Sequence, residues 1–368
     1  MNRIQQLHEV GQSVWLDSIS RGVLGPDGKL AAQVAAGIRG VTSNPTIFEK
    51  AVGGSDDYDA QIAEIMAATG AGRAPDAESV FEDLAIADIQ AACDVLCPVY
   101  DQAEGTDGFV SIEVAPDLAH DTEGTIVAAR RLWSRVDRPN VMVKVPATDE
   151  GVPAVEQLTA EGLNINITLM FALADYDAVA NAFITGLERC ADPARVRSVA
   201  SFFVSRVDTK ADAALDKIGT DAALALRGRS AVANAKLAYR RYQELFEGDR
   251  FSRLAAGGAR PQRVLWASTS TKNPAYPDTM YVDQLIGPDT VNTMPPATVD
   301  AFNDHGTVAI TLTEGLDDAE AVIAGLGDVG VSYDQVTREL QTEGVQAFAD
   351  SMAEVYATIE AKMAELRR

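Results

Sequence analysis

The sequence has little of what disulfide-bonded or metal-binding proteins need. Its 368 residues include only three cysteines and three histidines. No cysteine has a histidine partner at zinc-ligand spacing, so we expect free thiols in a reducing cytoplasm. His8, His120 and His305 lie far apart and match no ligand pattern, and we therefore expect no metal site.

Long apolar runs and positive charge are also scarce. The first residues contain no apolar core of a secretory signal, and no stretch approaches the length of a membrane span. With 31 Lys and Arg against 54 Asp and Glu, the net charge is −23. This charge argues against nucleic acids and membranes as partners and favours a cytoplasmic protein. Any phosphate site must be a local cluster of cations and backbone N–H groups.

The pattern of what is present predicts a (β/α)8 barrel. Short β-branched apolar runs alternate with amphipathic helical stretches, as in repeated βα units. The predicted strands are Ser13–Asp17, Gly40–Val41, Gly108–Val114, Val141–Pro146, Asn164–Met170, Val199–Val204, Arg263–Ala267 and Thr290–Met294. The predicted helices between them are Asp57–Ala67, Glu78–Val95, Thr122–Val136, Ala154–Glu161, Asp175–Arg189 and Thr209–Ile218. A TIM barrel is the favoured fold, and a doubly wound open sheet is the alternative.

The two ends of the chain predict helices that flank this barrel. The N-terminal segment Asn2–Val10 is amphipathic, and the tail from residue 333 predicts one or two helices over 336–340 and 345–366. Residues 221–247 predict a long helical insert, followed by a loop at 254–258. We expect residues 1–368 to form a single domain, with terminal helices at about 1–12 and 333–368 packing on the barrel.

One lysine differs from the other seven in its surroundings. Lys144 lies within the apolar run Val141–Pro146, whereas the others lie in polar, helical or loop-like segments. Burying an unpaired ammonium is costly, and burial favours the neutral amine, which can attack a carbonyl carbon. The alternative is a structural lysine paired with a core carboxylate, and Glu113 is the candidate partner.

Polar residues gather at or near the C-terminal ends of the predicted strands, where barrel enzymes carry their chemistry. These candidates are Asp17, Asn44, Glu113, Lys144, Asn166, Thr168, Ser201, Arg206, Ser268 and Lys272. Taken singly, some have structural explanations: Asp17 could cap a helix and Asn44 could be a turn residue. Asn166 and Thr168 lie two residues apart on one strand face and could bond within the sheet. Taken together, the set is too polar to serve stability alone.

The residue types fit one kind of chemistry. A neutral lysine can attack a ketone, a carboxylate and a bound water can move protons, and amides can hold substrate hydroxyls. The sequence has neither G-x-G-x-x-G after a predicted strand nor G-x-x-x-x-G-K-[ST]. We therefore expect no nucleotide cofactor.

Three motifs resemble those of transaldolases in order and spacing. Gly40–Phe48 resembles the signature at that family's second strand, and Ala200–Asp208 resembles its phosphate motif. Val141–Gly151 followed by Leu163–Leu169 resembles its active-site signature, lysine included. The resemblance covers almost the whole chain and implies a barrel of the class I aldolase type that uses no cofactor.

The resemblance implies a role for each candidate. Lys144 would form a Schiff base with a ketose phosphate and keep a dihydroxyacetone enamine after cleavage of the C3–C4 bond. Glu113, with a water held partly by Thr168, would shuttle protons, and Asp17 would accept and return the C4 hydroxyl proton. The substrate-binding residues would be Asn44, Asn166 and Ser201 at the hydroxyls, Phe203 over the intermediate, and Arg206 at the phosphate.

The implied reaction belongs to the non-oxidative pentose phosphate pathway. Sedoheptulose 7-phosphate and glyceraldehyde 3-phosphate would give erythrose 4-phosphate and fructose 6-phosphate. The partners would be phosphorylated ketoses and aldoses, and both a monomer and a homodimer remain open.

The phosphate site departs from the commonest family pattern. Many transaldolases have a second arginine after the seventh strand, whereas this chain has Ser268 and, slightly further on, Lys272. Long bacterial transaldolases share this form, so both residues are assigned to the phosphate. Lysine lacks the planar fork of arginine, and the contact geometry would differ. From the residues alone, Arg206 could instead pair with Asp208 on the surface.

Two other functions compete with transfer. A fructose-6-phosphate aldolase-like lyase shares the lysine and releases free dihydroxyacetone, but that group is much shorter and lacks an acid at the position of Glu113. A catalytically silent barrel that binds sugar phosphates is the second alternative. It has no need for the costly buried amine of Lys144.

Overall fold

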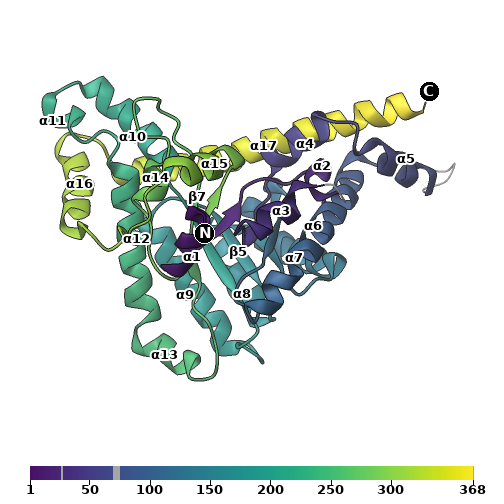
Figure 1. Cartoon of the computed structure of the whole chain (residues 1–368), viewed down its shortest axis with the longest axis horizontal. Helices are drawn as coiled ribbons and strands as arrows, with labels where there is room; N and C mark the ends of the chain where they lie inside the picture. Colours follow the sequence, from purple (N-terminus) through teal and green to yellow (C-terminus); the bar gives the residue numbers. More distant parts are fainter. Residues whose placement is uncertain (26–27, 69–74, 368) are drawn as a thin grey trace.

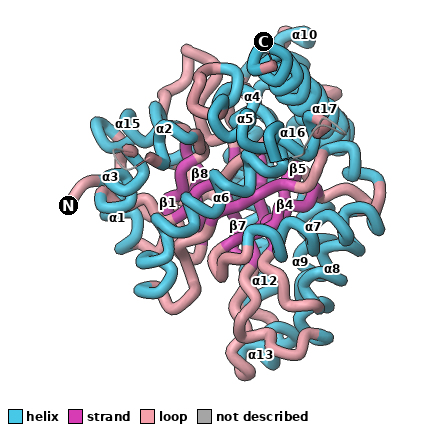
Figure 2. The backbone as a smooth tube through the Cα atoms, turned by 90° about the vertical axis from the view of Figure 1, so that its right-hand side faces the viewer, coloured by secondary structure: helices cyan, strands magenta, loops and turns pink. Residues whose placement is uncertain are grey.

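The computed structural model describes residues 1–25, 28–68 and 75–367. In these residues, eight strands pair in parallel with their sequence neighbours, and β8 pairs with β1 to close the barrel. Their bounds are β1 Gln12–Leu16, β2 Gly40–Val41, β3 Val110–Glu113, β4 Val141–Pro146, β5 Ile165–Met170, β6 Ser198–Phe203, β7 Arg263–Ala267 and β8 Thr290–Met294. The predicted (β/α)8 fold is confirmed, and Figure 2 shows the strands enclosed by helices.

Helices surround the strands and extend beyond the ends of the barrel (Figure 1). Their bounds are α1 Arg3–Glu9, α2 Arg21–Leu24, α3 Lys29–Ala35, α4 Pro45–Gly53, α5 Asp59–Ala68, α6 Ala77–Gln102, η1 Pro116–His120, α7 Thr122–Val136, α8 Gly151–Ala160, α9 Leu173–Arg189, α10 Ser205–Ile218, α11 Asp221–Leu224, α12 Ser230–Phe246, α13 Asp249–Ala255, α14 Met280–Asp283, α15 Pro296–His305, α16 Leu316–Asp328 and α17 Tyr333–Leu366. The strands agree with their predicted ranges to within two residues.

Several helical predictions need correction. Helix α6 continues to Gln102, past its predicted end at Val95, α10 begins at Ser205 and not at Thr209, and the tail forms the single helix α17. The insert predicted as one helix over 221–247 is broken into α11 and α12, because Gly228 adopts a left-handed φ of +67° between them. A Cβ at Gly228 would lie 2.7 Å from the ring of Tyr276, so only glycine fits this turn. The loop predicted at 254–258 begins late, since α13 continues to Ala255.

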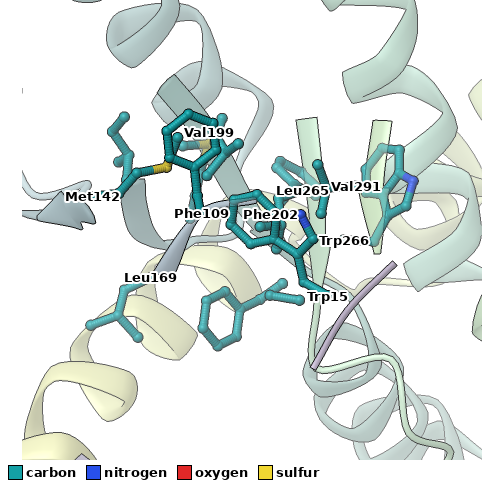
Figure 3. Close-up of a cluster of buried hydrophobic side chains, with 14 of the residues drawn as sticks. Trp15, Phe109, Met142, Leu169, Val199, Phe202, Leu265, Trp266 and Val291 are labelled. Atoms are coloured by element: carbon teal, nitrogen blue, oxygen red, sulfur yellow. The ribbon is translucent and has the colours of Figure 1, made fainter. Parts of the chain in front are cut away.

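The interior of the barrel is apolar in its N-terminal half. Trp15, Met142, Val199, Leu265 and Val291 are buried there, and Figure 3 shows them close together. Successive strand residues alternate between the two faces of a sheet. The residues two positions further along, such as Lys144 after Met142, therefore face the interior at its C-terminal half.

The C-terminal helix α17 crosses the C-terminal end of the barrel. It contacts α4, α5, α6, α10 and η1, and Figure 1 shows it as the long yellow helix beside α4. Gln341 donates hydrogen bonds to the carbonyls of Ala147 and Leu169, just beyond β4 and at the end of β5. Gly344 permits the close passage, because a Cβ there would lie 2.8 Å from the Leu169 side chain.

Candidate functional site

A cavity of ≈ 600 Å³ opens at the C-terminal end of the barrel. The predicted residues that line it are Asp17, Asn44, Lys144, Thr168, Ser201, Phe203, Arg206, Ser268 and Lys272. The two others, Glu113 and Asn166, lie behind this wall and hydrogen-bond to Lys144 and Ser201. The structure therefore brings all the predicted residues together.

Lys144 is buried at the floor of this cavity. Parallel pairing of β3 with β4 sets Glu113 opposite Lys144, and the Lys144 amine lies 3.0 Å from a Glu113 carboxylate oxygen. The amine also donates to the carbonyl of Ser43 at 2.9 Å. The ion pair expected for a structural lysine, between Lys144 and Glu113, is present. Lys144 nevertheless borders the cavity, where a ligand can reach it.

Two buried carboxyl groups flank the amine. Burial raises the pKa of Glu113, and the charge and hydrogen bond of Lys144 oppose this shift. Burial likewise raises the pKa of Asp17, against a hydrogen bond from Thr42 and the charges of Lys144, Lys272 and Arg206. The Thr42 hydroxyl donates to Asp17 at 2.7 Å. Asp17 thus accepts a side-chain donor inside the site, and the helix-cap reading is wrong.

A chain of polar side chains crosses the barrel interior beside Lys144. Asn166 on β5 donates to Ser111 on β3 at 2.9 Å and accepts from Ser201 on β6 at 2.7 Å. Since β3 and β5 are not neighbours, this chain spans the interior and is not part of the sheet ladder. The buried hydroxyl of Thr168 has no hydrogen-bond partner in the described structure, which leaves it free to hold a water or a substrate.

Asn44 combines its structural and its candidate role. Its side-chain oxygen accepts from the Ile47 N–H at 2.9 Å and caps α4, with Pro45 in the first helical turn. The residue also lines the cavity. The structural explanation of Asn44 is therefore correct, but it does not exclude a role in the site. The helix cap holds the side chain at the edge of the cavity.

Two cations stand at the outer part of the cavity. Arg206, in the first turn of α10, lies with its guanidinium 5.5 Å from the centre of the Phe203 ring. Burial lowers the pKa of Arg206, and burial together with the charge of Arg206 lowers the pKa of Lys272. Lys272 donates to Ser270 at 2.6 Å. Two cations that line the same part of the cavity form a site suited to an anion.

Arg206 does not pair with Asp208 on the surface. Asp208 is buried and accepts from the Ala231 N–H at 2.7 Å and from the Tyr281 hydroxyl at 2.8 Å. Within the described residues, Arg206 has no carboxylate partner. That alternative reading is wrong, and the guanidinium is free to bind a ligand.

Among the lining residues that the sequence analysis missed, three add charge, a hydroxyl group or an aromatic ring to the cavity. Lys50 comes from α4, Ser270 from the loop after β7, and Phe348 from α17. The Asn44-Pro45 helix start was a signal for Lys50, because it begins α4, and this helix borders the cavity. For Phe348 no local signal exists, since only the path of α17 across the barrel brings it there.

Within residues 1–25, 28–68 and 75–367, no three His, Cys, Asp or Glu side chains are grouped to hold a metal ion. In the same part of the chain no helix combines the length and apolar character needed to cross a membrane. The site is built from a lysine, two carboxyl groups, amides, hydroxyls and cations.

A parallel (β/α)8 barrel with a buried lysine beside a carboxylate at its C-terminal end fits the class of Schiff-base aldolases. A family model described as transaldolase/fructose-6-phosphate aldolase matches residues 14–359. A transaldolase of Frankia alni is 50% identical over 364 residues, covering 97% of this chain and 96% of its own length. Transaldolases of Thiobacillus denitrificans and Thermobifida fusca are each 48% identical, and cover 98% of this chain and 100% and 98% of their own lengths. The chain belongs to the transaldolase/fructose-6-phosphate aldolase family, as its motifs indicated.

Proposed function

We propose that this protein is a transaldolase that transfers a dihydroxyacetone unit from sedoheptulose 7-phosphate to glyceraldehyde 3-phosphate. The observation that carries this proposal is the Lys144 amine, 3.0 Å from Glu113 and bordering a cavity that also holds Asp17 and Arg206. Nucleophile, proton carriers and phosphate cation thus meet in one site. Relatives of nearly equal length that are named transaldolase support the same reaction.

The reaction begins with attack of the Lys144 amine on the C2 carbonyl carbon of the ketose. Glu113, at hydrogen-bond distance, protonates the oxygen that leaves as water and yields the iminium. The free hydroxyl of Thr168 holds this water. Glu113 also borders a second cavity, of ≈ 230 Å³.

Cleavage and transfer follow on the opposite wall. Asp17 accepts the proton of the C4 hydroxyl, the C3–C4 bond breaks, and its electron pair moves to the iminium to form an enamine. The aldose phosphate leaves as an aldehyde. The enamine then attacks the acceptor aldehyde, and Asp17 returns the proton to the new hydroxyl. A water adds to the resulting iminium carbon, the C–N bond to Lys144 breaks, and the ketose phosphate leaves with the free amine restored. Asn44, Asn166 and Ser201 hold the dihydroxyacetone hydroxyls throughout.

The phosphate of each sugar binds at the outer cations. Arg206 contributes a planar fork for bidentate contact, and Lys272 and the exposed Lys50 contribute point charges. Ser268 lies beside them with a left-handed φ of +56°, and its hydroxyl is 3.0 Å from that of Ser205. Phe203, under the guanidinium, limits the depth to which the phosphate enters.

Transfer is favoured over release of free dihydroxyacetone. The family includes both transaldolases and fructose-6-phosphate aldolases, but Glu113 and the full-length transaldolase relatives match the transferase type. We infer a cytoplasmic enzyme, because its substrates are metabolic sugar phosphates and Cys93, Cys97 and Cys190 are unpaired. All residues of the proposed site belong to one chain, so both a monomer and a homodimer are compatible with the proposed activity.

Borohydride trapping tests the proposal directly. The protein is incubated with fructose 6-phosphate without acceptor, reduced, digested and mapped by mass spectrometry. A three-carbon adduct on the peptide that contains Lys144 is expected, and the Lys144→Met variant should give none. Free dihydroxyacetone released at the rate of turnover would favour the lyase. Tight sugar phosphate binding without any adduct would favour the silent barrel.

A further inference from the structure

A second cavity rich in arginine lies at the opposite, N-terminal end of the barrel. Its volume is ≈ 700 Å³, and it is bordered by α1, by the loop before β3 and by the segments that lead into β2, β6 and β7. Four arginines line it: Arg39, Arg197, Arg260 and Arg263. In a chain of net charge −23 this is an unusual concentration of positive charge.

Three of these arginines have no carboxylate partner. Within the described residues, the side chains of Arg39 and Arg260 make no hydrogen bond or ion pair. Arg197 donates only to main-chain carbonyls. By contrast, an arginine such as Arg130 on α7 is held by a carboxylate. The state of these three resembles that of Arg206, the free cation of the catalytic site.

The acidic residues of the cavity do not neutralise them. Asp107 is occupied by two side-chain donors of β1 and a backbone N–H, and it lies 3.5 Å from Arg263. Glu104 and Asp289 are exposed at the rim, and in the described structure neither forms an ion pair with an arginine. Positive charge therefore remains directed at the cavity.

The free arginines approach from opposite sides. Arg39 precedes β2 and Arg197 precedes β6, and these strands lie four apart in the closed ring of eight. His8 of α1 lies near these charges: burial lowers its pKa, the charges of Arg39 and Arg263 lower it further, and the Gly37 hydrogen bond and the charge of Asp107 oppose the shift. The His8 Nε2 contacts the Gly37 carbonyl at 2.7 Å, so the ring is held in place.

We propose that this cavity binds an oligophosphate anion, with Arg39 at one end of the ligand and Arg197 and Arg260 at the other. Guanidinium groups bind phosphate oxygens bidentately, which suits arginine better than lysine for this contact. A single phosphate would reach one side only, whereas a chain of phosphates reaches both. A cavity of this size also accommodates an organic group attached to the phosphates.

Histidine resonances provide the test, because the chain has only three histidines. The ring signals are followed by NMR while inorganic tripolyphosphate, and separately ATP, is added to the full-length protein. We expect the His8 signals to shift saturably and its pKa to rise, since a nearby anion stabilises the imidazolium. His120 and His305, which lie elsewhere on the surface beside acidic residues, serve as internal references.

Paired variants locate the binding site. The double change Arg39→Gln and Arg260→Gln should weaken binding at least about tenfold. The matched change Arg195→Gln and Arg253→Gln removes the same charge from exposed arginines outside the cavity, and it should alter binding less than about twofold. Neither pair belongs to the catalytic site, so turnover should stay unchanged in both.

Three outcomes would overturn the proposal. They are no His8 response at millimolar tripolyphosphate, an unchanged response in the Arg39/Arg260 variant, and loss of the response in Arg206→Gln. The last would assign the anion to the catalytic cavity. Tighter binding of ATP than of tripolyphosphate identifies a nucleotide as the ligand, and equal binding identifies recognition by the phosphate chain alone. Both results support the site.

Discussion

Each end of the barrel holds a cavity lined by cationic side chains, but the two cavities are built differently. At the C-terminal end the polar groups belong to the strands: Lys144 and Asn166 point inward from β4 and β5 and are buried. At the N-terminal end the arginines belong mainly to the segments before the strands, and the interior behind them is an apolar layer that includes Trp15 and Val199. At the C-terminal end the groups around Lys144 are fixed by the sheet, and Arg206 and Lys272 come from the segments after the strands.

This difference separates catalysis from binding in physical terms. Strand register sets Lys144 opposite Glu113, so their 3.0 Å contact depends on the whole sheet. Chemistry requires such fixed positions, because small displacements of catalytic groups cost large factors in rate. Binding of a flexible anion tolerates cations on longer side chains, as at Arg39 and Arg260. Variants at the two ends should therefore differ in what they change.

The largest effect is expected from Lys144→Met, which keeps the length and removes the amine. Without the nucleophile no Schiff base forms, and kcat should fall on the order of 10⁴-fold or more. The measurement is acceptor-dependent turnover of fructose 6-phosphate with erythrose 4-phosphate. Lys217→Met, at an exposed position on α10, is the control and should retain full activity. More than about a hundredth of normal activity in Lys144→Met would contradict the assigned nucleophile.

Asp17→Asn should have the next largest effect. It should reduce kcat roughly 10²–10⁴-fold, because the amide cannot accept the C4 hydroxyl proton. Burial raises the pKa of Asp17 above its ordinary value of 3.8. The active form is the ionised one, so kcat/KM of the normal protein should fall as pH falls through this raised pKa. A profile from pH 4 to 8 measures it. An acid limb that stays unchanged in Asp17→Asn would assign that limb to another group, such as Glu113.

Much of this C-terminal end could be predicted from the sequence. Period-two alternation decides which strand residues face inward, so Asn166 and Thr168 had to share a face with the substrate once a barrel was expected. The bounds of β4, predicted at Val141–Pro146, were right because its β-branched run ends at a proline. The inward position of Lys144 follows from the strand alone.

The rest depends on tertiary structure that local patterns do not encode. Phe348 reaches the cavity because α17 crosses the barrel, and Gly344, where this helix passes Leu169, has an unremarkable sequence context. The arginines at the N-terminal end, such as Arg39 and Arg260, are far apart in the chain and meet only when the ring of strands closes. No spacing rule connects them.

Arginines at the two ends should respond differently to the same substitution. Arg206→Gln should raise KM for fructose 6-phosphate roughly 10–100-fold, since a charge-assisted contact to the phosphate is lost. Lys50→Gln, at an exposed position, should raise it only about threefold. Arg39→Gln should leave KM and kcat unchanged. Steady-state kinetics decides, and an equal effect of Arg206→Gln and Arg39→Gln would remove the distinction between the two cavities.

The smallest effect concerns stability and not turnover. Burial raises the pKa of Asp208 from 3.8 to about 6, so the folded protein keeps a proton that the unfolded chain has already lost. The free energy of unfolding should therefore fall as pH rises from about 4 to about 6, by roughly 3 kcal/mol from this group. Asp208→Asn retains the shape and cannot ionise, so its denaturation curves should lack this share of the pH dependence.

Denaturant unfolding at pH 4, 5, 6 and 7 checks the difference between Asp208→Asn and the normal protein, with Asp216→Asn, on the exposed side of α10, as the control. If the unfolding free energies of Asp208→Asn and of the normal protein change equally with pH, ionisation of the Asp208 carboxyl does not destabilise the fold, and the prediction is wrong. Asp208 lies in the first turn of α10, the helix that carries Arg206, and its bonds to Ala231 and Tyr281 fix that turn. A pH-dependent penalty here means that the C-terminal end gives up stability to hold its charged groups in place. At the other end burial lowers the pKa of His8, so the corresponding cost there appears as the pH falls.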